Sequence, residues 1–289
     1  NYVDRWFNVT EDESGYGKVI ESIRPEVERD YGTELDVTMI RRTKREVAPW
    51  MPEKQYPGVP LDPELPGSPV GVWIDMKGKQ ASAYQQMVDD AVADLESGQL
   101  MAAGLLAEMT RCKQMACAYG DVDHVLRQKP GTNYKEWVDK FRPMFPSNKW
   151  EWILEFLCER GITHKKSSWG EDKIIVASWQ SPLLNLMRAE AESLGITSRI
   201  ITGAVSGAER ARAKQEFQSP KGPRLLFLNT IAGGVSLTLD NCDEMVILDQ
   251  TWVPDDMEQL EDRIDRISRG EGRHPCTYWY LHSRGTIEA

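Results

Sequence analysis

The feature that most constrains the fold is a regular alternation of short apolar runs with amphipathic segments, which begins near residue 147 and continues to the end of the chain. The apolar runs have the length of buried strands and cover residues 173–178, 199–202, 224–229, 245–249 and 277–281. Apolar residues recur at helical spacing over 150–160, 183–194, 208–217 and 255–269. Apolar strands that alternate with helices are typical of a parallel sheet covered on both faces. We therefore predict an α/β fold.

The first half of the chain is more mixed. Residues 1–48 are polar and charged with helical spacing, and they end in a basic cluster at 41–45. Seven prolines between positions 49 and 69 exclude a helix or a central strand and predict an extended crossing segment. We expect a short strand at 70–74, two helices around Gly104 within 80–120, and a mixed connector at 121–146.

Composition limits the class of protein. The 289 residues are 40% hydrophobic and 28% charged, which is enough apolar material for about two domains with a buried core. No apolar run approaches the ~18 residues of a membrane span. The formal charge of −10 argues against bulk electrostatic adhesion to nucleic acid but allows a local basic track. Because the sequence begins at Asn1 rather than at a methionine, we expect it to be a piece of a longer chain.

The five cysteines are odd in number and lie mostly inside apolar runs. This pattern favours buried free thiols in a reducing, intracellular compartment. Cys112, Cys117 and His124 do not have the spacing of a zinc site and lack a fourth ligand. No metal site is predicted.

Small polar residues follow four of the predicted strands. They are Ser178, Thr202 with Gly203, Thr230 and Asp249. Any one of them is more typical of a helix cap or a turn. The carboxyl ends of parallel strands meet at one edge, where open α/β sheets bind their ligands. The four together therefore predict a ligand-binding edge.

Two arginines follow a stretch without basic residues. If 255–269 is a helix, Gln259, Arg263 and Arg266 lie on one face. The adjacent stripe of Leu260, Ile264 and Ile267 is then expected to pack on the sheet. Paired guanidiniums beside a glycine turn are suited to polyphosphate. The alternative is a solvated face on which Glu261, Asp262 and Asp265 pair locally, and no phosphate-binding G-x-x-x-x-G-K-[ST] loop occurs anywhere in the chain.

These motifs appear in an order that resembles a known family. The order is Arg41-Arg42-Thr43-Lys44, the 173–178 strand, Thr202-Gly203 with Arg210 and Phe217, Ala232-Gly233-Gly234, Asp249-x-x-Trp252, Gln259, Arg263, Arg266 and Gly285-Thr286-Ile287-Glu288. The chain resembles the second RecA-like lobe of Swi/Snf-like ATPases, the duplex-DNA translocase branch of superfamily two helicases. The resemblance is strongest over 147–288 and extends more weakly back to Arg41.

The resemblance implies three segments and a set of roles. Residues 1–48 would be a helical remnant from the end of the first motor lobe, 49–146 the crossing segment with a helical protrusion, and 147–289 the second RecA-like lobe. ATP with Mg²⁺ would be held mostly by a first lobe that this sequence lacks, and that lobe and duplex DNA are the implied partners. By position, Arg266 resembles the arginine finger, Arg263 its partner and Gln259 the residue that orients them. Gly233, Gly234, Ser236 and Thr238 would bind ATP, and Ser178, Thr202, Gly203 and Thr230 would contact the DNA backbone.

The sequence departs from the family pattern at three places. Ser236 stands where a glycine is usual, which puts the ribose contact in doubt because a side chain occupies a close backbone approach. Ser268-Arg269 replaces the usual Gly-Gln, and Ala177 replaces a common phenylalanine.

Two further interpretations compete with a motor lobe that is inactive in ATP hydrolysis on its own. One is a degenerate module that only binds DNA or a protein partner, which the departures at Ser236 and Ser268 favour. The other is an unrelated doubly wound enzyme with a small cofactor, but 178–182 is not a glycine-rich loop. The short insertion suggests a small motor of bacterial or viral origin.

Overall fold

The computed structural model describes residues 7–11, 18–25, 27, 30, 44–129, 134–231 and 237–288. The chain divides into two compact units, Asn1–Trp50 and Met51–Ala289. In the first unit, β1 (Phe7–Glu11) pairs antiparallel with β2 (Lys18–Ile23), and α3 (Lys44–Val47) is a single short helix. The expectation that residues 1–48 are a helical remnant is therefore wrong for the residues of these two strands. Val9, Thr10, Val19 and Ile20 are β-branched and favour a strand over a helix.

A seven-stranded sheet organises the second unit, in the order β10-β11-β9-β12-β13-β4-β3. The strands are β3 (Val59–Pro60), β4 (Val70–Ile74), β9 (Ile174–Ser178), β10 (Ser198–Ile201), β11 (Leu225–Asn229), β12 (Glu244–Ile247) and β13 (Thr277–Ser283). All neighbouring pairs are parallel except β3 with β4. The predicted parallel α/β sheet is confirmed.

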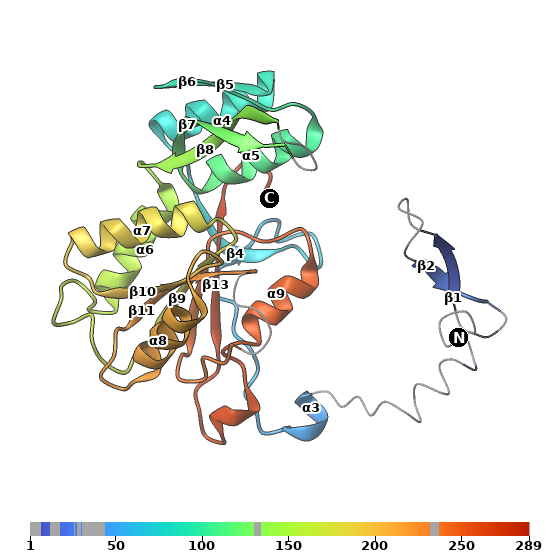
Figure 1. Cartoon of the computed structure of the whole chain (residues 1–289). Coiled ribbons are helices and arrows are strands. Elements are labelled where there is room, and N and C mark those ends of the chain that lie inside the picture. Colours follow the sequence, from blue (N-terminus) through green and yellow to red (C-terminus); the bar gives the residue numbers. More distant parts are fainter. Residues whose placement is uncertain are drawn as a thin grey trace. The chain divides into compact units, whose positions relative to one another are not determined.

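Helices cover both faces of this sheet (Figure 1). They are α6 (Asn148–Glu159), α7 (Ser181–Ser193), α8 (Gly207–Gln218) and α9 (Pro254–Glu261). Alternate residues of β9 pack against the helices on opposite faces of the sheet: Val176 packs with α6 and α7, whereas Ile175 and Ala177 pack with α8 and α9. Both clusters are fully buried, because side chains alternate across a sheet and each face of this one is apolar.

The sheet reaches further back in the chain than residue 147. The short strand expected at 70–74 forms as β4, and its partner is β13, with Ile74 opposite Ser283. The proline-rich segment runs along the other end of β13, where Gln55 forms a bridge with Thr277. Pro60 lies in the edge strand β3, the place in a sheet where a missing N–H does least harm.

The insertion between β4 and α6 is a protrusion with its own apolar core. It contains α4 (Gly78–Asp90), β5 (Val92–Leu95), β6 (Gly98–Met101), α5 (Leu105–Cys117), β7 (Tyr119–Gln128) and β8 (Lys135–Met144). Two helices do flank Gly104, as predicted. The helical character is only partial, because β5 and β6 form a hairpin and the expected connector 121–146 is the long hairpin of β7 and β8. Alternating Val122, His124 and Leu126 on β7 is the strand signal that the sequence reading missed.

Candidate functional site

The four polar strand ends lie on four neighbouring strands. Thr202, Thr230, Ser178 and Asp249 follow or end β10, β11, β9 and β12, which are adjacent in that order. Because these strands are parallel, the residues share the carboxyl edge of the sheet. The four residues therefore lie at one edge of the sheet, and ligand binding there stays a prediction.

Asp249 is the centre of a hydrogen-bond network at this edge. Its Oδ2 accepts from Ser178 Oγ at 2.6 Å and Gln180 Nε2 at 3.1 Å, and its Oδ1 accepts from Trp179 N at 2.9 Å. Burial raises the pKa of this carboxyl group, and the three donors oppose the rise. The carboxylate thus fixes the loop that follows β9 against the end of β12.

A second buried charge, Lys149, contacts the chain just after β12, at the residue before Asp249. Lys149 of α6 is fully buried, donates to Leu248 O, and lies 2.7 Å from both carboxylate oxygens of Glu288. The chain end is thereby tied to α6 and to the residue before Asp249. Sequence reasoning missed Lys149, since a lysine on an amphipathic helix carries no local sign that it will be buried.

The helix that was expected to carry both arginines ends early. The α9 helix stops at Glu261, so the prediction that Gln259, Arg263 and Arg266 share one helical face is wrong. Two carbonyls of the following turn accept tertiary hydrogen bonds: Tyr278 OH donates to Glu261 O at 2.9 Å, in addition to the local Ile264 N and Asp265 N, and Leu239 N donates to Arg263 O at 2.9 Å. Gln259 is exposed on α9.

The stripe that was expected beside the arginines is only partly buried. Leu260 and Ile264 are fully buried, but Ile267 is 44% exposed because it begins the short 3-10 helix η1 (Ile267–Arg269).

Arg263 lies against the start of the predicted glycine turn. Its Nη2 donates to Thr230 O at 3.2 Å, while its backbone carbonyl holds Leu239 on the far side of that turn. Only 7% of Arg263 is exposed, and among the described residues its Nε and Nη1 have no hydrogen-bond partner. Burial lowers the pKa of Arg263, and the positive charge of Arg266 lowers it further. Gly233, Gly234 and Ser236 lie outside the described residues.

Arg266 and the residues after it are held in different ways. The Nε of Arg266 is buried and also has no partner in the described part of the chain. At the Ser268-Arg269 departure from the family pattern, Ser268 Oγ donates to Asp240 Oδ2 at 2.7 Å. Arg269, the second residue of this departure, forms an ion pair with Asp243. Thr238 is half-buried, and its carbonyl accepts from Gln218 Nε2 at 3.2 Å.

The α9 helix is anchored by a carboxylate that sequence analysis assigned to a solvated face. Glu261 is buried and pairs with Lys54 Nζ at 2.9 Å, while Tyr56 OH and Tyr280 OH donate to it at 2.8 and 2.6 Å. Burial lowers the pKa of Lys54, but its hydrogen bond and ion pair with Glu261 outweigh this and the net shift is upward. No local pattern predicts this cluster, since Lys54 is 207 residues away in the chain.

The residues predicted to contact DNA differ in their availability. Ser178 is fully buried, and its hydroxyl is engaged with Asp249. Thr202 and Thr230 are each 2% exposed, and the Thr230 hydroxyl has no partner among the described residues. Gly203 is exposed. The edge therefore presents one free buried hydroxyl and one accessible glycine.

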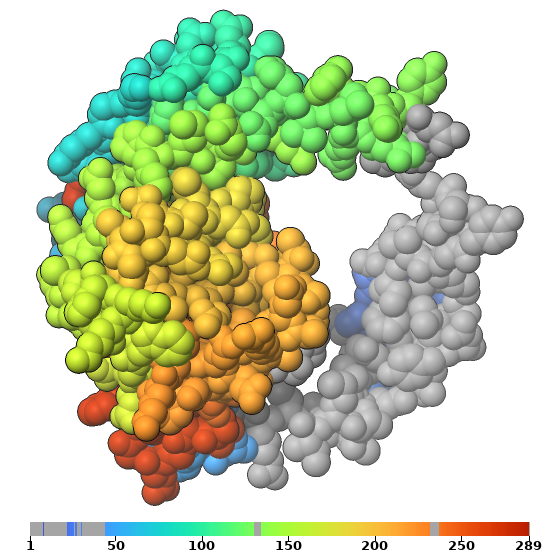
Figure 2. All heavy atoms as spheres, turned by 60° about the vertical axis from the view of Figure 1, so that its left-hand side comes forward, coloured from blue at the N-terminus to red at the C-terminus, as the bar shows by residue number. Residues whose placement is uncertain are grey.

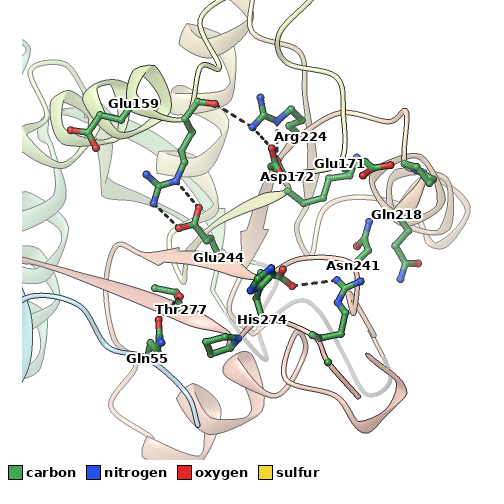
Figure 3. A pocket seen from close by; sticks show the side chains of 17 residues that line it. Gln55, Glu159, Glu171, Asp172, Gln218, Arg224, Asn241, Glu244, His274 and Thr277 are labelled. Carbon is green, nitrogen blue, oxygen red and sulfur yellow. Dashed lines mark hydrogen bonds and ion pairs between the residues drawn. The ribbon is translucent and has the colours of Figure 1, made fainter. Parts of the chain in front are cut away.

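A large open cleft lies at the opposite, amino edge of the sheet (Figure 3). It has a volume of about 1230 Å³. Its arginines are already matched by carboxylates: Arg160 with Glu244 at 2.6 Å, Arg224 with Asp172 at 3.4 Å and Arg273 with Asp243 at 3.3 Å. At the carboxyl edge, Thr230 and Arg263 keep side-chain donors that lack acceptors among the described residues, and we regard this edge as the candidate site.

The described part of the chain contains no group of three or more His, Cys, Asp or Glu residues that could hold a metal ion. Nor is any helix there long and apolar enough to cross a membrane. The five cysteines are free, with Cys158 exposed and the other four buried.

Comparisons with known proteins agree with this geometry. Residues 148–268 match the family described as "Helicase conserved C-terminal domain". A viral "Probable global transactivator" (Orgyia pseudotsugata multicapsid polyhedrosis virus) is 25% identical over 84% of this chain and 44% of its own length. The human "DNA repair and recombination protein RAD54-like" is 28% identical over 47% of this chain and 17% of its own. The Arabidopsis thaliana "Probable ATP-dependent DNA helicase CHR23" is 23% identical over 99% of this chain and 24% of its own length.

The fold also has a solved counterpart, the crystal structure of "the C-terminal part of Fun30 ATPase domain". It aligns with a TM-score of 0.54 and 13% identity, covering 82% of this chain and 87% of that one. This chain spans less than half of each curated relative named above. The matched segment 148–268 holds both arginines and the four polar strand ends, and the matches together support the resemblance to a C-terminal RecA-like lobe of the Swi/Snf-like branch of helicase superfamily two.

Proposed function

We propose that this chain is the second lobe of a DNA-stimulated ATPase that moves along duplex DNA, and that it supplies Arg266 and Arg263 to the phosphates of ATP. The observation that carries the proposal is the state of the Arg263 guanidinium. It is buried beside a second arginine, and two of its nitrogens lack acceptors among the described residues.

Such an arrangement favours an anionic ligand. A buried donor without an acceptor costs about 1–3 kcal/mol, and two neighbouring positive charges repel each other. Phosphate oxygens would remove both penalties, since the planar guanidinium matches their geometry. In this role the arginines would stabilise negative charge on the phosphoryl group in transfer. ATP would supply that group.

Other parts of an ATPase site are not evident in the described residues. A cluster of acidic metal ligands is absent there, and the sequence has no phosphate-binding loop. The proposal therefore assigns Mg²⁺ and the main phosphate ligands to a first lobe, and it expects this chain alone to be inactive in hydrolysis. The relatives named above are all longer than this chain.

The DNA contacts are proposed for the same carboxyl edge. Backbone N–H groups and hydroxyls can hold DNA phosphates without a basic surface, which suits a chain of net charge −10. Thr202, Gly203 and Thr230 are proposed to make these contacts. For Ser178 we propose a supporting role through Asp249, because its hydroxyl is already engaged.

The test is ATP hydrolysis by the intact protein, with and without duplex DNA. We expect strong stimulation by DNA that falls at least about a hundredfold in Arg266→Ala, the loss typical of a missing charge-stabilising group. Arg212→Ala is the matched control, since this arginine is 79% exposed on α8 and should leave turnover unchanged. If DNA stimulates no turnover, the chain is a degenerate binding module. Turnover by the isolated chain, abolished by Arg266→Ala, would contradict the division of labour between lobes.

A further inference from the structure

One face of the β7–β8 hairpin is buried in the core of the protrusion near the base of the hairpin and exposed to solvent at its outer end. Near its base, Val122 lies opposite Phe141 and both are buried in that core. Four residues further out, the same face presents Leu126 opposite Trp137. These side chains are 46% and 70% exposed. The hairpin thus extends past the elements that cover its base, and in Figure 2 its green and yellow-green atoms project as an arm.

On the other face of the hairpin, opposite charges flank a half-buried apolar pair, Val125 opposite Val138. Arg142 contacts Asp121 at 3.2 Å and Asp123 at 2.9 Å. Further out, Arg127 lies opposite Glu136 in the register. Opposite charges across neighbouring strands satisfy each other. The face with Leu126 and Trp137 is therefore the one that is open to a ligand.

The surroundings of this open pair are basic and aromatic. Lys135 is on the same face, two residues from Trp137, and Lys129 is close by at the outer end of the arm. Tyr134 is 80% exposed. Toward the base, the one carboxylate on this face, Asp139, is matched by His124 at 2.7 Å. A locally basic, aromatic surface is unusual in a chain whose formal charge is −10.

We propose that this arm is a second DNA-binding site, which stacks unpaired bases on Trp137 and Tyr134 and contacts the adjacent phosphates through Lys135. The inference rests on the proposed function, because it supposes that the protein acts on DNA. Size decides between nucleic acid and protein as the ligand. A stable protein interface buries about 1,600 Å² in total, far more than one apolar pair offers, whereas a single aromatic ring suffices for a base.

The test is fluorescence anisotropy of labelled DNA with the intact protein. The probes are a duplex with a single-stranded overhang and a blunt duplex of the same sequence. We expect Trp137→Ala to weaken binding of the overhang probe about tenfold, as loss of one stacking partner does, and to change blunt-duplex binding little. Trp137→Tyr should restore binding, and Lys135→Glu should weaken it. The matched control is Trp169→Ala, which removes a 42% exposed tryptophan far from the arm in sequence.

The outcomes separate this inference from the proposed function. If the protein binds blunt duplex and shows DNA-stimulated hydrolysis, but Trp137→Ala binds the overhang normally, the arm is not a DNA site and a protein ligand replaces it. If Trp169→Ala weakens binding as much as Trp137→Ala, the effect is not specific to the arm and the inference is overturned. If neither probe binds to the wild-type protein, the proposed function itself fails.

Discussion

At the scale of single residues, the site contrasts satisfied carboxylates with unsatisfied arginines. Asp249 and Glu261 are buried acids, and each accepts hydrogen bonds from three side-chain or backbone donors. Arg263 is as deeply buried, yet two of its nitrogens lack partners among the described residues. Buried polar groups are nearly always paired. The carboxylates therefore act as internal supports, and Arg263 is the group that we propose binds a ligand.

The support role of Glu261 predicts a stability loss. Glu261→Ala removes the acceptor of two tyrosine hydroxyls and the nearer of the two carboxylates that pair with Lys54, and we expect the free energy of unfolding to fall by about 2–4 kcal/mol. Urea denaturation followed by circular dichroism measures this change. The control is Glu258→Ala on the same helix, where an exposed glutamate should alter stability by less than about 0.5 kcal/mol. Equal effects of the two substitutions would show that the buried cluster contributes nothing.

His282 predicts how stability depends on pH. Burial, and then the nearby charge of Lys149, lower the pKa of His282 from 6.5 to about 4. The unfolded chain thus binds the proton before the folded chain does. The contribution of His282 to stability is complete above pH 6.5 and is lost as the pH falls toward 4, by up to about 3 kcal/mol.

Unfolding titrations at several pH values compare wild type with His282→Asn. We expect the variant to have a shallower loss of stability over this pH range. His164→Asn, which changes an exposed histidine, should follow the wild type. A pH dependence that is identical in all three proteins would show that His282 takes up its proton normally.

At the scale of elements, β4 is a short strand whose partner in the sheet, β13, is about two hundred residues away in the chain. It pairs with β13, and Gly71 gives the two strands room beside the His282 ring. A Cβ at position 71 would lie 2.5 Å from Cδ2 of His282 and 2.8 Å from Tyr280 O. The backbone contact cannot be relieved by rotating a side chain.

Gly71→Ala should therefore lower the free energy of unfolding by about 1–3 kcal/mol, the usual cost of overpacking. Gly207→Ala is the matched control, because a Cβ there meets nothing within 4 Å. Melting temperatures of the two variants measure the difference. A normal melting temperature in Gly71→Ala would contradict the close packing of β4 on β13.

The elements also show why the strands of the sheet could be predicted from the sequence while the end of α9 could not. The strands of the sheet are continuous apolar runs, and their alternation with amphipathic helices predicts a parallel sheet covered on both faces. No local signal in the sequence marked the end of α9, where Tyr278 and Leu239, both remote in sequence, contact the turn that follows. Arg263 was recognised from its motif, whereas its distance from Thr230 came only with the structure.

At the scale of the whole molecule, the chain end joins the sheet to the protrusion within the second unit. Glu288 pairs with Lys149 of α6, and Ile287 N donates to Tyr84 OH of α4 at 2.8 Å. Burial raises the pKa of Glu288, and the charge of Lys149 opposes the rise. One short segment thus ties elements that are far apart in sequence.

Removal of this carboxylate predicts a large, global effect. Glu288→Ala leaves the fully buried Lys149 without its counter-charge, so we expect a loss of about 3–5 kcal/mol in the free energy of unfolding. Replacing both partners, as in Lys149→Met with Glu288→Leu, should recover much of it, since no buried charge remains. Glu271→Ala, an exposed change, should be neutral. Denaturant titrations of the four proteins would refute the prediction if the single and double variants were equally stable.

The two connections of the protrusion meet at almost one point. The chain leaves the sheet after Ile74, which is opposite Ser283, and it returns at Asn148, whose side chain donates to Ser283 Oγ at 2.8 Å. Everything between is therefore a cassette whose two connections to the sheet lie side by side. Such a cassette can be lengthened, shortened or exchanged without rethreading a strand of the sheet. The sequence and length of the protrusion can therefore change while the sheet and its arginines stay the same.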